Sequence, residues 1–254
     1  DRSVSRGLGD VYKRQIHRLQ DYYIENGAKK KEPWFSQRGI EMKFVMSYSC
    51  GKDSTLALHK LIKAGHEPVG LLVMVNKDMD RSWFHGADHR LLEKFSKALE
   101  IPLFLCPSGG DEYHLEFEKG LKRAMELGAE MAGFGDIDIE NNRRWCEERC
   151  RAAGLKAAFP LWQQGREKIV QEIISEGYCC IVKSIDNQLL PKELLGKQLD
   201  SETLEIMAAR GIDICGENGE YHTIAVDGPI FRHKLEIQTG SILDFGERSV
   251  IDLR

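Results

Sequence analysis

The sequence predicts an α/β fold, in which a parallel twisted sheet is sandwiched by helices and followed by a smaller C-terminal subdomain. Three observations predict this fold. From Met42 onward, short apolar runs alternate with segments whose apolar residues recur at helical spacing. Residues 69–76 are apolar on both faces, as expected of a strand buried in a parallel sheet. After Asp186, short apolar runs alternate with Gly, Asp and Pro, which is typical of a small β-rich unit.

The elements follow in order from these patterns. Strands are predicted at 43–47, 69–76, 103–106, 131–135 and 179–185, and helices at 54–64, 85–99, 113–127, 139–153, 169–176 and 204–210. Apolar runs at 224–226, 235–237 and 250–253 belong to the C-terminal unit. We divide the chain into an N-terminal extension (1–41), a main domain (42–186) and a C-terminal subdomain (187–254). In the extension, 16–26 is a predicted helix, and 1–15 has no fold signal and is interpreted as foreign to the natural protein.

Charge and cysteine usage exclude several classes of protein. The 254 residues carry 36 Lys and Arg against 40 Asp and Glu, and a net charge of −4 argues against a protein that wraps nucleic acid. No apolar run approaches the roughly 20 residues needed to cross a bilayer, and no signal-peptide pattern opens the chain. Seven cysteines, none in a C-x-x-C pair, predict reduced thiols in a cytoplasmic protein.

A phosphate-binding loop is predicted between the first strand and the first helix of the main domain. Its residues are Ser49, Cys50, Gly51, Lys52, Asp53 and Ser54. A glycine-bearing turn that leads into a helix N-terminus directs backbone N–H groups and a favourable dipole at an anion. Lys52 supplies a positive charge for the leaving phosphates, and Asp53 is suited to hold Mg²⁺. The alternative is a serine-rich turn that caps an ordinary helix.

The loop differs from a Walker A motif, which requires a glycine where this chain has Met46. A loop that binds the β- and γ-phosphates leaves the α-phosphorus accessible, so pyrophosphate becomes the leaving group. Gly135 and Asp136 follow a later strand at its C-terminal end, where open parallel sheets bind ligands. We expect Asp136 to assist Mg²⁺ or to orient an acceptor, while Asp138 suits the N-cap of the next helix.

These motifs together resemble a known family. The loop resembles the SGGKDS loop of the PP-loop ATP pyrophosphatases, which have a Rossmann-like fold and belong to the adenine nucleotide alpha hydrolase superfamily. The run Gly216-Glu217-Asn218-Gly219-Glu220-Tyr221-His222-Thr223 is similar to a signature of the diphthine–ammonia ligase family. Three shorter segments that also resemble the family lie between these two motifs in the expected order, at 134–137, 159–162 and 194–197. Cys50 departs from the pattern, which has Gly at that position, so its side chain must point away from the phosphates or tolerate the backbone angles of the turn.

The resemblance implies an ATP-dependent amide ligase. ATP adenylates a carboxylate, pyrophosphate leaves, and ammonia displaces AMP; in diphthine–ammonia ligase the carboxylate belongs to diphthine on translation elongation factor two. The main domain would then bind ATP and Mg²⁺, and the C-terminal subdomain would bind the acceptor. Ammonia arrives as ammonium and must lose a proton, for which Glu220 or His222 is a suitable base. Glu217, Tyr221 and Thr223 complete the expected acceptor site, and Asn76 is expected to meet adenine through its main chain.

Several alternatives remain open at this point. The chain could be a related PP-loop ligase with a different acceptor, a tRNA thiolase, or a nucleotide-binding sensor without catalysis. A thiolase needs a paired or persulfide-carrying cysteine near the loop and a basic surface, and the sequence offers neither clearly. Metal sites at Cys146 and Cys150 or at His85 and His89 have suitable spacing on a helix but lack further ligands. The sequence leaves open a homodimer.

Overall fold

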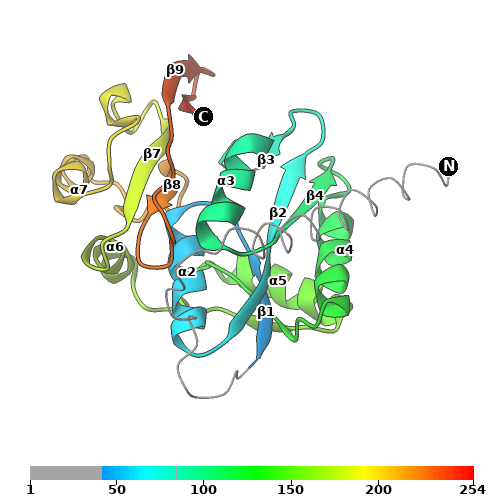
Figure 1. The fold of residues 1–254 in the computed structure, drawn as a ribbon. Helices are drawn as coiled ribbons and strands as arrows, with labels where there is room; N and C mark the ends of the chain where they lie inside the picture. Colours follow the sequence, from blue (N-terminus) through cyan, green and yellow to red (C-terminus); the bar gives the residue numbers. More distant parts are fainter. Residues whose placement is uncertain (1–41, 84) are drawn as a thin grey trace.

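The computed structural model describes residues 42–83 and 85–254. The predicted helix at 16–26 and the interpretation of residues 1–15 lie outside the described residues. Figure 1 shows the chain running from a first sheet, which carries helices on both faces, into a second sheet that contains the C-terminus.

The first sheet is parallel in its main strands, and β1 lies at its centre. Along the sheet the order is β4-β2-β1-β5-β6, and the short β3 pairs antiparallel with the end of β2. The strands are β1 (Lys43–Ser47), β2 (Glu67–Asn76), β3 (Arg81–Ser82), β4 (Leu103–Ser108), β5 (Met131–Gly133) and β6 (Lys156–Ala158). This arrangement confirms the predicted parallel sheet. The order reverses at β1, with β2 and β4 on one side and β5 and β6 on the other.

Helices cover both faces of this sheet, and β2 shows why its sequence is apolar throughout. Leu71 and Val73 of β2 belong to the core shared with α2 and α3, whereas Leu72 and Met74 belong to the core under α4 and α5. Alternate side chains therefore enter opposite cores, which both need apolar residues. The helices are α2 (Lys52–Lys63), α3 (His89–Leu99), α4 (Tyr113–Glu126) and α5 (Glu140–Ala153).

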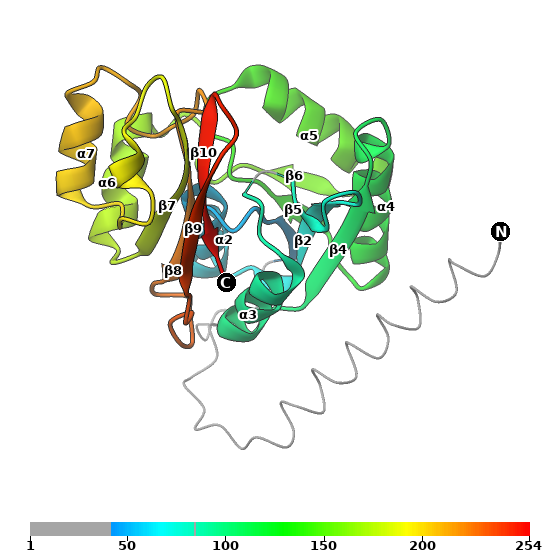
Figure 2. The same cartoon turned by 90° about the horizontal axis from the view of Figure 1, so that it is seen from above.

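The second sheet is antiparallel, with the order β8-β7-β10-β9. Its strands are β7 (Cys179–Asp186), β8 (Tyr221–Asp227), β9 (Thr239–Asp244) and β10 (Arg248–Leu253). Figure 2 shows α6 (Arg166–Ser175) and α7 (Ser201–Ala208) on the side of this sheet that faces away from the first sheet. A short 3₁₀ turn spans Lys192–Leu194. The predicted β-rich C-terminal unit is present as this sheet.

The structure corrects four details of the predicted elements. The strand predicted at 179–185 pairs in the second sheet, so the change of sheet precedes Cys179 instead of following Asp186; hydrophobic periodicity identifies a strand but not its partner. The helix predicted from His85 begins at His89, because the Asp88 side chain accepts a hydrogen bond from Leu91 N and caps it. The short strands β3 and β6 and the strand β9 were not predicted, and 235–237 is not a strand. The division into domains stays a prediction.

No helix in the described part of the chain is long and apolar enough to cross a membrane. All seven cysteines are free thiols, and all except Cys179 are buried. Neither pair weighed as a metal site, Cys146 with Cys150 or His85 with His89, belongs to a metal-ligand cluster among the described residues. His85 lies before α3, so the two histidines do not share a helix face.

Candidate active site

A cleft lies where the order of the first sheet reverses. The loop after β1 leads into α2 and the loop after β5 leads into α5, so the two loops diverge at the carboxyl ends of neighbouring strands. Open α/β sheets bind ligands at such a point. The cleft has a volume of about 410 Å³ and is lined by residues of the phosphate loop, of the middle of β2, of 134–136 and of 216–223. The two sheets thus contribute opposite walls.

The phosphate loop is held in shape by its own hydroxyl groups. Ser49 and Ser54 lie with their Oγ atoms 3.1 Å apart, and Ser49 N donates to Ser54 Oγ at 3.3 Å. Ser54 Oγ in turn donates to the carbonyl oxygen of Gly51 at 3.1 Å. Gly51 is the N-cap of α2 and offers no side-chain cap, which leaves the positive end of the helix for an anion.

Cys50 points away from the cleft and adopts the backbone angles of the turn, so both expectations for this position are met. Its φ is +70°, a left-handed conformation that favours glycine, and its side chain is fully buried in the core. Ala225 N of β8 donates to its carbonyl oxygen at 2.9 Å. Burial raises the pKa of the Cys50 thiol well above its usual value. The thiol is therefore a small packed side chain and not a reactive nucleophile.

Lys52 is buried and paired with its neighbour. Its Nζ lies 2.7 Å from Asp53 Oδ2 and 5.6 Å from the centre of the Tyr221 ring, and only 5% of the residue is exposed. Burial acts to lower the pKa of Lys52, but the charge and hydrogen bond of Asp53, together with Tyr221 and Cys215, outweigh burial and the pKa is raised. The ammonium group therefore stays charged at the wall of the cleft. Lys52 N also donates to Thr223 Oγ1 at 3.2 Å, which joins α2 to β8.

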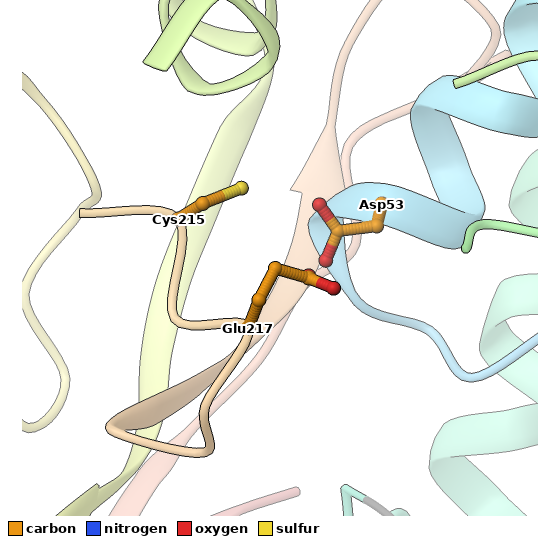
Figure 3. A group of neighbouring side chains, drawn as sticks. All are labelled: Asp53, Cys215 and Glu217. Carbon is orange, nitrogen blue, oxygen red and sulfur yellow. The ribbon is translucent and has the colours of Figure 1, made fainter. Parts of the chain in front are cut away.

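Asp53, Cys215 and Glu217 form a cluster in which one ligand atom from each lies within 4.8 Å of the others. In Figure 3 the three side chains converge from the start of α2 and from the loop before β8. Asp53 Oδ1 is buried and has no hydrogen-bond partner, which is the condition expected of an oxygen that meets a cation. The Asp53 carboxylate fits Mg²⁺, while burial keeps the Cys215 thiol protonated by raising its pKa, so Cys215 is unsuited as a Mg²⁺ ligand.

Glu217 is held at the cleft through its backbone, by a neighbouring carboxylate that takes part in an ion pair. Arg166, at the start of α6, contacts Asp138 Oδ2 at 2.7 Å and Asp213 Oδ2 at 2.6 Å. The same Asp213 oxygen accepts the backbone N–H of Glu217 at 3.1 Å. Asp138 therefore binds Arg166 and does not cap α5, whose N-cap is Ile139. Burial and the nearby Asp53 raise the pKa of Glu217 to about 7.

Glu220 is near the cleft but does not line it. Both its carboxylate oxygens are used within its own loop, where they accept from Asn218 N and Asn218 Nδ2, each at 3.0 Å. The residue is 4% exposed. The expected base at this position is thus a support for the loop, and the carboxylate that enters the cleft is Glu217.

Tyr221 and Asn76 also differ from the predicted contacts. The Tyr221 hydroxyl donates to the carbonyl oxygen of Ile214 at 2.6 Å, and its ring faces Lys52, so it packs beneath the phosphate loop. Asn76 does not line the cleft; its Oδ1 accepts from Asp78 N and its carbonyl oxygen accepts from Asp80 N. The part of β2 that reaches the cleft lies earlier, at 72–74.

Two histidines line the cleft, of which the sequence indicated one. His222 and His85 pack edge to face with ring centres 5.1 Å apart. Burial lowers the pKa of His85 to about 3 and that of His222 to about 4, so both rings are neutral at pH 7. A Cβ at Gly51 would lie 3.0 Å from the His85 ring, so only glycine leaves this ring its place. Nothing in the sequence singled out His85 for the cleft, because it was assigned to a helix.

Gly135 and Asp136 lie against the start of α2. A Cβ at Gly135 would approach Ser54 N to 2.9 Å and Asp53 C to 3.0 Å, so glycine is required for this close contact. Asp136 lines the cleft, and burial raises its pKa to about 6. The predicted residues thus line one cleft, apart from Cys50, Gly51, Asn76 and Glu220.

Comparisons with known proteins show the family to which the chain belongs. Residues 42–157 match the family described as Diphthamide synthase N-terminal domain, and 165–254 match Diphthamide synthase C-terminal domain. The curated protein named Diphthine--ammonia ligase from Bos taurus is 26% identical in an alignment of 234 residues, and the match covers 80% of this chain and 85% of that protein. Proteins of the same name from Homo sapiens and Schizosaccharomyces pombe are 26% and 24% identical over 80% and 84% of this chain, and over 85% and 39% of their own lengths.

A crystal structure titled as a predicted subunit of tRNA methyltransferase from Methanocaldococcus jannaschii aligns with a TM-score of 0.41. It is 15% identical, and the alignment covers 76% of this chain and 100% of that chain. The fold assignment rests on the strand order described above and not on this alignment.

Proposed function

The chain belongs to the diphthamide synthase family, and on that premise we propose that it uses ATP and ammonia to convert the carboxylate of diphthine into an amide. The acceptor carboxylate attacks the α-phosphorus of ATP, and the bond to the β-phosphate breaks to release pyrophosphate. Ammonia then attacks the acyl carbon, and AMP leaves. We place the acceptor on a translation elongation factor and the reaction in the cytoplasm.

The observation that carries this proposal is the meeting of the phosphate loop with the 216–223 segment across one cleft. Lys52, at the positive end of α2, is suited to bind the phosphates that leave as pyrophosphate. Asp53 is the residue that would hold Mg²⁺, which when bound neutralises phosphate charge, and Glu217 lies beside it in the same cluster. Backbone N–H groups and Lys52 act mainly by position, because adenylyl transfer needs little covalent chemistry from the protein.

Glu217 is our choice for the group that takes the proton of ammonium. Its carboxylate lines the cleft, and its pKa of about 7 suits a general base at neutral pH. His222 lines the same cleft with a neutral ring, but burial lowers its pKa to about 4, so it is a weaker base than Glu217. A homodimer, which the sequence leaves open, is no part of the proposal.

The test is to supply ATP, Mg²⁺, ammonium and the diphthine-bearing elongation factor to the full chain. AMP and pyrophosphate should appear in equal amounts, and mass analysis of the factor should show an amide in place of the carboxylate. ADP and phosphate as the main products would contradict the binding mode of the loop. Pyrophosphate release with another carboxylate acceptor, but not with the factor, would keep the ligase chemistry and remove diphthine as the acceptor.

A further inference from the structure

A second cavity, of about 510 Å³, adjoins the active-site cleft. We call it the aromatic pocket and define it by Tyr113, Phe117, Phe134, Trp145 and Asp136. Tyr113, Phe134 and Asp136 line both cavities, so the two spaces meet at these residues. The pocket lies over the α4 and α5 side of the first sheet, opposite the phosphate loop of α2.

Four rings form the apolar wall of the aromatic pocket. The ring centres of Phe117 and Trp145 are 5.2 Å apart, and those of Tyr113 and Trp145 are 6.0 Å apart. Phe134 lies 6.3 Å from Phe117 at a tilted angle. Phe117 and Phe134 are buried, whereas Tyr113 and Trp145 are partly exposed and form the open side. A ligand in the aromatic pocket would therefore contact the faces and edges of several rings.

Asp136 gives the aromatic pocket its charge. Among the described residues it is the only carboxylate that lines the pocket. Its Oδ2 has a weak contact with the Cys146 thiol at 3.9 Å, and the charge that acts on it is the negative charge of Asp53. No lysine or arginine of the described chain forms an ion pair with Asp136, so the aromatic pocket favours a cationic ligand.

We propose that the aromatic pocket binds the quaternary ammonium group of the acceptor, with Asp136 as its counter-charge. The proposal rests on the function proposed above, because diphthine carries a trimethylammonium group beside its carboxylate. Such a group cannot donate hydrogen bonds, so ring faces and a nearby negative charge are what recognise it. Tyr221 is not available for this role, since its ring faces Lys52.

The position of the pocket suits the reaction. A cation between Trp145 and Asp136 would place the neighbouring carboxylate at the border shared with the cleft, where the phosphate loop binds ATP. The alternative ligand for the aromatic pocket is the adenine base of ATP. It has an apolar wall of its own inside the cleft, made by residues 72–74 of β2 and Trp83, and a neutral base gains little from an unbalanced carboxylate.

The experiment measures binding of choline, a trimethylammonium probe, to the full chain by calorimetry, with and without saturating α,β-methylene ATP. Its neutral isostere 3,3-dimethyl-1-butanol is the comparison ligand. We expect choline to bind in both conditions, and roughly tenfold more tightly than the neutral compound. Trp145→Leu and Asp136→Asn should each weaken choline roughly tenfold, while Trp145→Phe should keep most of the affinity because it retains a ring.

Trp162→Leu is the matched control, because Trp162 lies outside the pocket, and it should bind choline as the wild type does. The melting temperature of each variant separates loss of the site from loss of the fold. Choline and the ATP analogue excluding each other would assign the pocket to adenine and overturn the proposal. Absence of choline binding, or equal binding by Trp145→Leu, would overturn it too. Amide formation by the wild type is measured separately, so failure of the proposed function can be distinguished from failure of the proposal for the aromatic pocket.

Discussion

Lys52 Nζ and Asp53 Oδ2 lie 2.7 Å apart, so two adjacent residues of the phosphate loop neutralise each other at the wall of the cleft. The pair explains how a lysine that is only 5% exposed remains charged. It also keeps one carboxylate oxygen, Asp53 Oδ1, for a cation. An incoming Mg²⁺ and the phosphates of ATP would therefore find both of their counter-charges already in position.

Removing either charge should stop catalysis, with different effects on stability. Lys52→Met keeps most of the buried volume but leaves Asp53 without its partner, which should cost up to about 3 kcal/mol of unfolding free energy. Asp53→Asn is isosteric and should cost less. Both variants should release pyrophosphate at least about 100-fold more slowly. Initial rates of pyrophosphate release and denaturant unfolding curves measure the two effects.

Lys60→Met is the control for these variants. Lys60 is on the same helix and pairs with Glu172 at 2.7 Å, but it lies away from the cleft. Its replacement should change stability by less than about 1 kcal/mol and leave activity intact. Normal pyrophosphate release by Lys52→Met or Asp53→Asn would remove the loop from the mechanism.

Gly135→Ala should impair ATP binding through contact with the backbone. The added Cβ would lie 2.9 Å from Ser54 N and 3.0 Å from Asp53 C, so the start of α2 must shift. Overpacking of this kind costs about 1–3 kcal/mol, and a displacement of about 1 Å can lower the rate about 100-fold. Gly110→Ala, where a Cβ meets nothing within 4 Å, should bind ATP normally. Equal ATP affinity in both variants, measured by calorimetry, would contradict the close-contact argument.

The sequence predicted those features that depend on neighbouring residues. The phosphate loop, its strand and its helix lie within 43–63, so local pattern and motif are sufficient to place them. The features it missed depend on distant partners. The pairing of β7 with β8, and the entry of His85 into the cleft, are set by contacts with segments more than 30 residues away. Glu220 and Glu217 differ only in the direction in which the loop turns their side chains, which composition does not encode.

Arg166→Gln should slow the reaction while leaving ATP affinity within about twofold. The guanidinium joins Asp138 to Asp213, and Asp213 holds the backbone N–H of Glu217. Loss of this support should lower kcat about tenfold. It should also raise the pKa of Glu217, because the positive charge of Arg166 acts to lower it. The pH at which kcat is half-maximal should therefore move upward.

Arg143→Gln provides the comparison, because Arg143 pairs with Glu147 along α5 and does not line the cleft. Arg166→Lys retains the charge but not the forked geometry, so it should recover the pH profile better than the rate. A pH profile that is unchanged in Arg166→Gln would show that Arg166 has only a structural role.

The pH dependence of the unfolding free energy should reveal the raised pKa of Glu217 independently of any role of this residue in catalysis. Burial raises its pKa in the folded protein to about 7, above the usual value of a glutamate. The folded state therefore binds this proton more tightly than the unfolded state, and the resulting stability is present below the unfolded pKa. It is lost as the pH rises from about 4.5 to about 7. Glu217→Gln should consequently lose less stability than the wild type between pH 5 and pH 8.

Glu217 should also determine how kcat depends on pH at saturating ammonium and ATP. If Glu217 takes the proton, kcat of the wild type should rise through pH 7 as the carboxylate forms, and Glu217→Gln should lack that rise. His85 and His222 do not titrate in this range, because burial lowers their pKa values to about 3 and 4. Asp136, with its pKa raised to about 6, would give an earlier rise. A rise near pH 6 that survives Glu217→Gln and disappears in Asp136→Asn would transfer the role of base to Asp136.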